Sequence, residues 1–154
     1  MSMRTIVPAF AVSVVLGAAA FTATAHMGTW KLNEAKSKLD PGATKNTTVV
    51  YVSAGDNVKI TVDGLDGAGK PVHTEWTGKF DGKPYAVTGN PAADTRVYTE
   101  VNDHTLSFVE KKGQTVTNSG RAVVSADGKR RTVTASATDS TGKKIKTHAV
   151  YDKQ

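Results

Sequence analysis

The sequence predicts an all-β protein that folds as a single antiparallel up-and-down β-barrel of eight to ten strands. Short runs of alternating apolar and polar residues recur along the chain, and turn residues separate them. Residues 26–154 contain 15 valines and 18 threonines, which are β-branched and fit a pleated, half-buried surface. The turns between the runs are short, whereas the Greek-key connections of a β-sandwich, the alternative fold, are usually longer. These observations favour the barrel.

The first 25 residues have the pattern of a secretory signal peptide. A retained membrane anchor is the alternative, but the apolar run of 16 residues is shorter than the ~20 needed to span a bilayer. Cleavage would leave residues 26–154 as one domain in the periplasm or outside the cell. The chain has no cysteine, so this domain must be stable without disulfides. The features of the signal peptide are Arg4, the apolar residues 6–21 and the small-residue site Ala23-Thr24-Ala25.

The strands are expected to begin at "TWKL" (residues 29–32) and to end in the last ten residues. Asp81-Gly82 and Asp127-Gly128 predict tight hairpin turns between them. Only "NEAKSKLD" (residues 33–40) has a helical pattern, with Asn33 as its cap and Pro41-Gly42 at its end. A short helical turn after the first strand, followed by a long meander, is typical of a closed barrel.

The stretch Gly28-Thr29-Trp30-Lys31-Leu32 resembles the first strand of calycin barrels, the lipocalins and fatty-acid-binding proteins. The resemblance implies that Trp30 closes one end of the barrel, and that Gly28 lets the backbone enter where a Cβ would crowd the barrel floor. The ending "VYDKQ" is similar to the last strand of fatty-acid-binding proteins. A closer resemblance, to small exported bacterial lipocalin-like proteins without an assigned function, rests on "GTWKLN", Lys36-Ser37 and "VTGNPAAD" (residues 87–94).

The chain departs from both families at residues that bind ligand or pack on the tryptophan. Fatty-acid-binding proteins hold the ligand carboxylate with an arginine two residues before the tyrosine of the last strand, where this chain has Ala149 before Tyr151. The lipocalin Thr-Asp-Tyr-like motif and the last-strand arginine that packs on the tryptophan are not evident. The resemblance therefore implies the barrel and the structural role of Trp30, but not fatty-acid binding.

The leading functional hypothesis is a binding module for a small apolar or amphipathic ligand, because barrels of this size can enclose one such molecule. Four aromatic side chains are the candidate ligand contacts: Trp76, Tyr98, Phe108 and Tyr151. Gly89, Asn90 and Pro91 impose a special backbone path, which predicts either a loop over the barrel mouth or a corner turn. Which face of each strand points inward is left open by the sequence.

Charge supports an alternative role in protein interaction. Residues 26–103 carry 9 basic and 10 acidic side chains, whereas residues 104–154 carry 10 and 4. The basic 104–154 face could dock an acidic partner, as in an envelope inhibitor. Lysines near turns and strand edges also prevent pairing with other chains, which is the structural explanation.

Other classes of function find little support. Zinc needs three or four ligands, and His73 with Glu75 offers two. His26 would chelate copper only if cleavage makes it the N-terminal residue. No G-x-S-x-G elbow is present, and the aromatics do not cluster with basic residues as a nucleic-acid platform requires. We therefore expect a monomer without a metal or cofactor, not an enzyme, and with no nucleic-acid or stable membrane partner.

Overall fold

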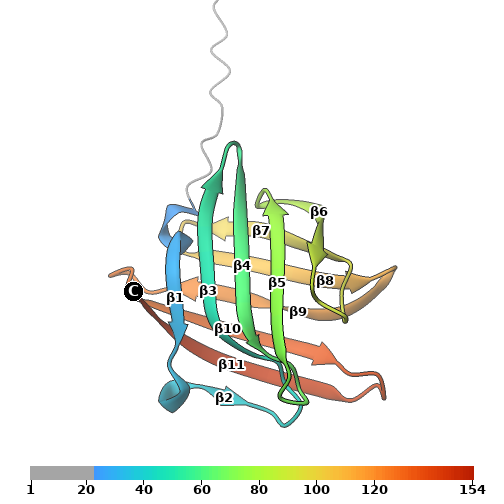
Figure 1. Ribbon diagram of the computed structural model, residues 1–154. Coiled ribbons are helices and arrows are strands. Elements are labelled where there is room, and N and C mark those ends of the chain that lie inside the picture. The colour runs from blue at the N-terminus through green and yellow to red at the C-terminus, as the bar shows by residue number, and fades with distance from the viewer. Residues whose placement is uncertain (1–22) are drawn as a thin grey trace, which may run out of the picture.

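The computed structural model describes residues 23–154, which form β-strands and two short 3-10 helices (Figure 1). Residues 1–22, most of the expected signal peptide, lie outside the described residues, and its cleavage stays a prediction. No helix within residues 23–154 has the length and apolar character required to cross a membrane. The elements are η1 (Ala23–His26), β1 (Gly28–Leu32), η2 (Glu34–Lys36), β2 (Lys38–Leu39), β3 (Lys45–Ala54), β4 (Asn57–Leu65), β5 (Pro71–Gly78), β6 (Asp81–Thr88), β7 (Thr95–Asn102), β8 (Thr105–Lys112), β9 (Thr115–Val124), β10 (Arg130–Thr138) and β11 (Lys144–Lys153).

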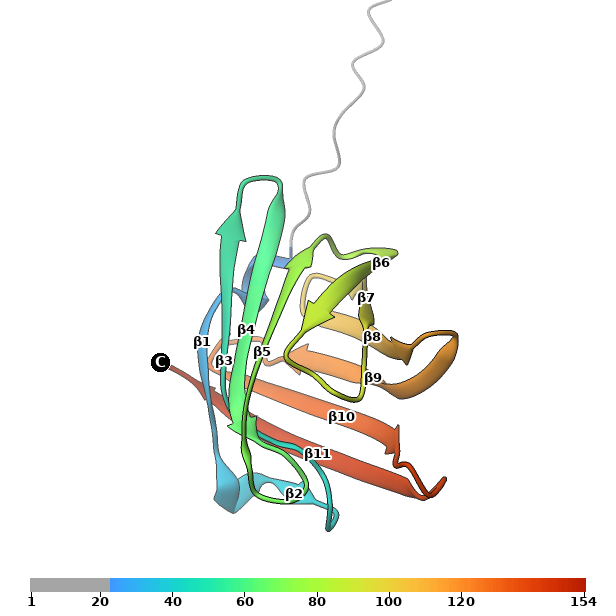
Figure 2. The ribbon, with the colours of Figure 1, turned by 45° about the vertical axis from the view of Figure 1, so that its right-hand side comes forward.

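The strands form one antiparallel sheet in which β1 pairs with both β3 and β11. From β3 to β11, each strand pairs with the next strand along the chain, so ten strands close into an up-and-down barrel. Strand β2 lies outside this closed order and pairs only with β11. The predicted fold class is confirmed. Figure 2 shows β1, β3, β4 and β5 crossing in front of β10 and β11.

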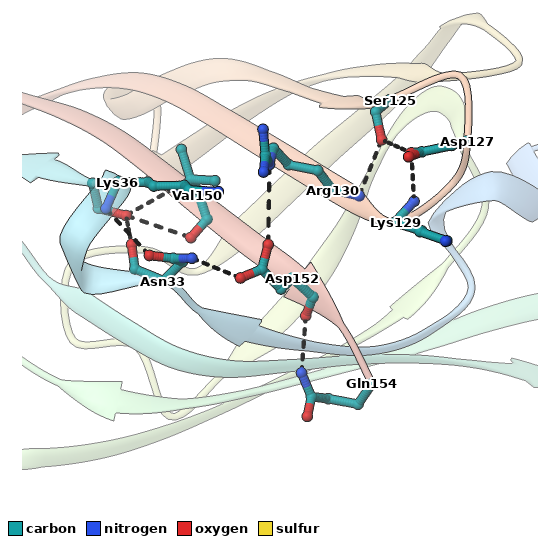
Figure 3. Close-up of polar contacts among 10 residues, drawn as sticks. Asn33, Lys36, Ser125, Asp127, Lys129, Arg130, Val150, Asp152 and Gln154 are labelled. Carbon is teal, nitrogen blue, oxygen red and sulfur yellow. Dashed lines mark hydrogen bonds and ion pairs between the residues drawn. The ribbon is translucent and has the colours of Figure 1, made fainter.

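Strand β1 completes the barrel, and Asp152 supports this closure from the end of β11. Its carboxylate accepts a hydrogen bond of 2.7 Å from the side-chain amide of Asn33 and lies 4.0 Å from Nε of Arg130 (Figure 3). Asn33 also accepts a hydrogen bond from the backbone N–H of Lys36, as the capping residue of η2. One side chain thus caps η2 while it is tied to the last strand.

The expected short helical turn after the first strand is η2, which covers only Glu34–Lys36 of the pattern in residues 33–40. The backbone at Ser37 is extended, and its hydroxyl contacts the carbonyls of Asn33 and Val150. Lys38 and Leu39 then pair with His148 and Thr147 of β11. Tertiary strand pairing has overridden a weak local helix preference.

One of the two expected hairpin turns forms at the predicted residues. Asp81-Gly82 is instead the start of β6, where Asp81 pairs with Thr99 of β7 and the register shifts between Asp81 and Pro84. Asp127-Gly128 lies between β9 and β10, where Oδ1 of Asp127 accepts the Lys129 N–H. Such short connections hold the long strands in consecutive order.

The core is concentrated at the end of the barrel where β1 begins. Trp30 is 0% exposed, and its indole N–H donates to the His26 carbonyl at 2.9 Å. Nζ of Lys153 lies 5.1 Å from the centre of the Trp30 ring, so a last-strand lysine packs on the tryptophan. The largest fully buried side chains are Trp30, Trp76, Tyr51, Ile60, Leu106 and His26. We call this part of the barrel the closed end.

The reason for a glycine at residue 28 differs from the expected one. A Cβ there would meet only the flexible end of the Lys153 side chain, at 3.1 Å from Cε. The stronger constraint is the backbone, because Gly28 has φ of 106°, which other residues rarely adopt. Gly28 therefore sets the entry of the chain into β1 rather than relieving crowding at the barrel floor.

Candidate functional site

The barrel contains a cavity of about 330 Å³ away from the closed end. On β3, Asn46 and Val49 line it while Tyr51 does not, and on β4 Val62 lines it while Ile60 does not. None of the largest fully buried side chains of the closed end is part of its wall. The interior is thus filled at one end and hollow at the other. The apolar wall residues include Leu32, Leu39, Val49, Val62, Val133 and Ile145.

Three of the four predicted contact residues line this cavity: Tyr98, Phe108 and Tyr151. Tyr151 is buried and donates its hydroxyl to the Asn46 carbonyl at 3.1 Å. Trp76 is not part of the cavity wall, because it is 1% exposed and packs against Tyr98 with ring centres 4.9 Å apart. Contact of these residues with a ligand stays a prediction.

Trp76 belongs instead to an aromatic cluster behind the wall. Its ring stacks on Phe80, with centres 6.1 Å apart, and meets the edge of Tyr85 at 5.7 Å. Its indole N–H donates to the carbonyl of Arg96 at 3.1 Å. The cluster fixes the position of Tyr98, which presents its own ring to the cavity.

A buried ion pair between Arg96 and Glu110 forms part of the cavity wall. Arg96 donates to Glu110 through Nε at 2.8 Å and through Nη2. Asn118 donates to the second carboxylate oxygen at 2.9 Å, and Asn90 approaches the first at 3.4 Å. Burial acts to lower the pKa of Arg96, but the charges of Tyr98 and Glu110 outweigh it and raise that pKa above its usual range. Arg96 is therefore charged, and Glu110 and Asn118 satisfy the polar groups of the pair.

A second arginine, Arg131, reaches the cavity from β10 and is 5% exposed. Its Nη2 donates to the Tyr51 hydroxyl at 2.6 Å. Its guanidinium lies 5.2 Å from the Tyr51 ring centre and 5.5 Å from that of Tyr151. Its Nε has no hydrogen-bond partner among the described residues. The two arginines thus have different surroundings in the same cavity.

The predicted mouth segment Gly89-Asn90-Pro91 borders the cavity together with Ala92. Gly89 has φ of 74°, and a Cβ there would lie 2.0 Å from the His73 carbonyl oxygen, so no other residue fits. Asn90 turns the segment by accepting the Ala92 N–H at 3.0 Å while its amide points to Glu110. The structure places these residues beside the cavity and joins them to the Arg96–Glu110 pair.

The paired His73 and Glu75 lie on the outer surface of β5 rather than in the cavity. Nδ1 of His73 is 2.6 Å from Asp63, and its Nε2 is 3.5 Å from Glu75. The hydrogen bond to Asp63, followed by that to Glu75, raises the pKa of His73 above its ordinary value. No group of three or more His, Cys, Asp or Glu residues within residues 23–154 has the geometry of a metal site.

Sequence reasoning missed Arg96, Glu110 and Arg131 as cavity residues. A usable pattern was present, because Arg96 is two residues before Tyr98 and Glu110 is two residues after Phe108. Side chains two apart share a strand face, so the choice of Tyr98 and Phe108 as inward-facing implied these two charges as well. Arg131 had a weaker indication, since it faces Tyr151 across the β10–β11 pair.

Comparison with known proteins gives a limited result. No family model and no curated protein matches the chain. A redesigned β-barrel, mFAP1, bound to DFHBI, has 14% identity and a TM-score of 0.49 over 86% of this chain and 98% of its own. EF1p2_mFAP2b bound to DFHBI has 11% identity and a TM-score of 0.49, covering 86% of this chain and 97% of its own. At this similarity the assignment of the barrel rests on the strand pairing of the chain itself.

Proposed function

We propose that the protein is a binding module that encloses one small amphipathic molecule in the cavity. The observation that carries the proposal is the unequal filling of the interior, with large side chains at the closed end and a cavity of about 330 Å³ beyond them. This volume is at the lower end of the range for small-molecule sites, ~300–1,000 Å³. Apolar walls with few polar groups also fit such a ligand.

The proposal includes export and a monomeric state. The pattern of residues 1–25 supports a signal peptide, and each barrel strand of the described residues pairs with a neighbour on both sides. The role is binding rather than catalysis. This part of the proposal is supported by Arg96 and Glu110, the buried charged pair of the cavity wall, which are bonded to each other and to Asn118.

Native mass spectrometry of protein purified from its own periplasm tests this function. We expect a complex with one small molecule that is lost in Ala137→Phe, where a large side chain fills the cavity. Thr134→Phe is the matched control, because Thr134 is exposed on the same strand. Protein that is empty, and whose melting temperature is unchanged by a panel of lipids and metabolites, would contradict the proposal. So would a bound mass that persists in Ala137→Phe.

A second candidate function is docking of an acidic protein on the outer surface of β9–β11 and β2. Arg121, Thr134, His148 and Lys38 are exposed and lie opposite one another in one cross-strand row. Neither Arg121 nor Lys38 has an ion-pair partner among the described residues, whereas Lys59 is paired with Glu75. A stoichiometric protein partner that is lost in Arg121→Glu but retained in Lys59→Glu would favour this function over ligand binding.

A further inference from the structure

Arg131 is a buried cation without a counter-ion. It faces Tyr151 in the β10–β11 register and is 5% exposed. No carboxylate of the described residues lies within ion-pair distance of its guanidinium. A buried charge is costly unless it is paired and hydrogen-bonded, and Nε of Arg131 is left without a partner. The folded protein therefore lacks an anion that would compensate the positive charge of Arg131.

The tyrosines around Arg131 do not provide this anion. Burial raises the pKa of Tyr51 well above its usual range, although the charge of Arg131 opposes the rise. Burial likewise raises the pKa of Tyr151. Both phenols are therefore neutral. They offer one hydroxyl acceptor and two ring faces to the guanidinium, which attract a cation but do not cancel its charge.

The other charges of the cavity wall are paired or lie away from Arg131. Arg96 and Glu110 form a pair, so together they contribute no net charge. Asp66 and Asp139 are part-exposed in the β4–β5 and β10–β11 turns, where each accepts two backbone N–H groups of its own turn, whereas Arg131 lies at the opposite end of β10. The inner part of the cavity is consequently left with the single positive charge of Arg131.

We propose that the cavity is selective for monoanionic amphipathic molecules whose acidic head group binds Arg131. This inference rests on the proposed function and names the chemical class of its ligand. The head group accepts hydrogen bonds from Arg131, and the apolar body contacts Phe108, Val133 and Ala149, which line the same cavity. A second negative charge would find no free cation beside it. A cationic head group would be repelled.

Four probes with the same eight-carbon chain separate these cases: octanoate, 1-octanol, octylamine and octanedioate. Binding is measured by calorimetry at pH 7.5 on the full-length mature protein. We expect octanoate to bind about tenfold or more tightly than 1-octanol, since a hydrogen bond to a charged group contributes ~1.5–3 kcal/mol, and 1.4 kcal/mol corresponds to a factor of ten. Octanedioate and octylamine should both bind more weakly than octanoate.

Arg131→Met should reduce octanoate affinity to that of 1-octanol and leave 1-octanol binding in place. Arg130→Met is the matched control, because Arg130 is exposed and precedes Arg131 on β10, and should retain the wild-type preference. Equal binding of octanoate and 1-octanol by the wild type overturns the inference while the proposed function stands. Binding of none of the four overturns both. The wild-type comparison decides the question even if Arg131→Met does not fold.

Discussion

The two ends of the barrel are built from side chains of different size on the same strands. On β11, Tyr151 lies toward the closed end, and Ala149 and Thr147 follow it at the inward positions, before Ile145 near the β10–β11 turn. On β10, Arg131 is followed by Val133, Ala135 and Ala137. The backbone wall is continuous, so the cavity exists because small residues occupy the inward positions away from the closed end. Side-chain volume, rather than topology, decides where this barrel is hollow.

The closed end and the cavity also differ in how their polar groups are satisfied. At the closed end, the indole N–H of Trp30 is satisfied by the His26 carbonyl within the same segment. In the cavity, polar groups come from several strands, as in the pairing of Arg96 on β7 with Glu110 on β8. Dense packing provides stability at one end. The other end gives up some of that packing for a cavity with apolar walls and a few polar groups, which is the usual composition of a ligand site.

The largest effect should come from Trp30→Ala. It removes one of the two fully buried tryptophans and its hydrogen bond to His26, at an expected cost of ~3–5 kcal/mol. That approaches the whole stability of many domains, ~5–15 kcal/mol. Urea denaturation of the two proteins measures the difference. Phe108→Ala in the cavity wall is the comparison and should cost clearly less, because one side of Phe108 already faces the cavity.

A Trp30→Ala variant that melts within a degree or two of the wild type while ligand binding is lost would reverse the comparison. Trp30 would then belong to a functional site, and the closed end would not be the main source of stability.

The next effect concerns the two buried arginines. Arg96→Met leaves the carboxylate of Glu110 buried without its main partner, and breaking a buried pair in this way typically costs ~3–5 kcal/mol. Arg131→Met leaves no charge behind, so the stability of the ligand-free protein should change by less than ~1 kcal/mol or rise. Chemical denaturation of both variants tests this. Equal losses in the two would show that Arg131 has a counter-charge in the folded protein.

Much of the fold could be predicted because its determinants are local. Asp127-Gly128 supplies a tight turn between alternating runs, and such turns pair consecutive strands. The Gly-x-Trp stretch placed a tryptophan on the first strand, where the structure buries it completely. Strand β2 could not be predicted, since two residues pair only because β11 offers them a partner.

The cavity residues were harder to predict from the sequence than the fold, for a physical reason. A period of two shows that Arg96 and Tyr98 share a face, but threonines on both faces hide which one points inward. An arginine in an alternating strand also has the pattern of a solvent-facing residue, and only its pairing with Glu110, 14 residues away, makes burial tolerable. Trp76 shows the opposite case, because its size suggested a cavity position that the aromatic cluster behind the wall occupies instead.

The smallest effect, a pH dependence, also separates the closed end from the outer surface. Burial, followed by the charge of Arg131, lowers the pKa of His26 to about 3. In the unfolded chain His26 takes up a proton below its ordinary pKa of ~6.5, whereas in the folded state it does not until about pH 3. The stability from neutral His26 is therefore complete above pH 6.5 and is lost as the pH falls. At pH 5 the loss should be about 2 kcal/mol relative to pH 8.

His73 has the opposite effect on the pH dependence of stability, because Asp63 and Glu75 raise its pKa. Its contribution is present below its unfolded pKa and is lost as the pH rises through the folded one. Denaturation at pH 5 and pH 8 distinguishes the two histidines: His26→Leu should flatten the loss of stability toward pH 5, whereas His73→Gln should make that loss larger. If His26→Leu keeps the full loss between pH 8 and pH 5, the closed end does not hold His26 neutral. The acid sensitivity must then originate elsewhere in the barrel.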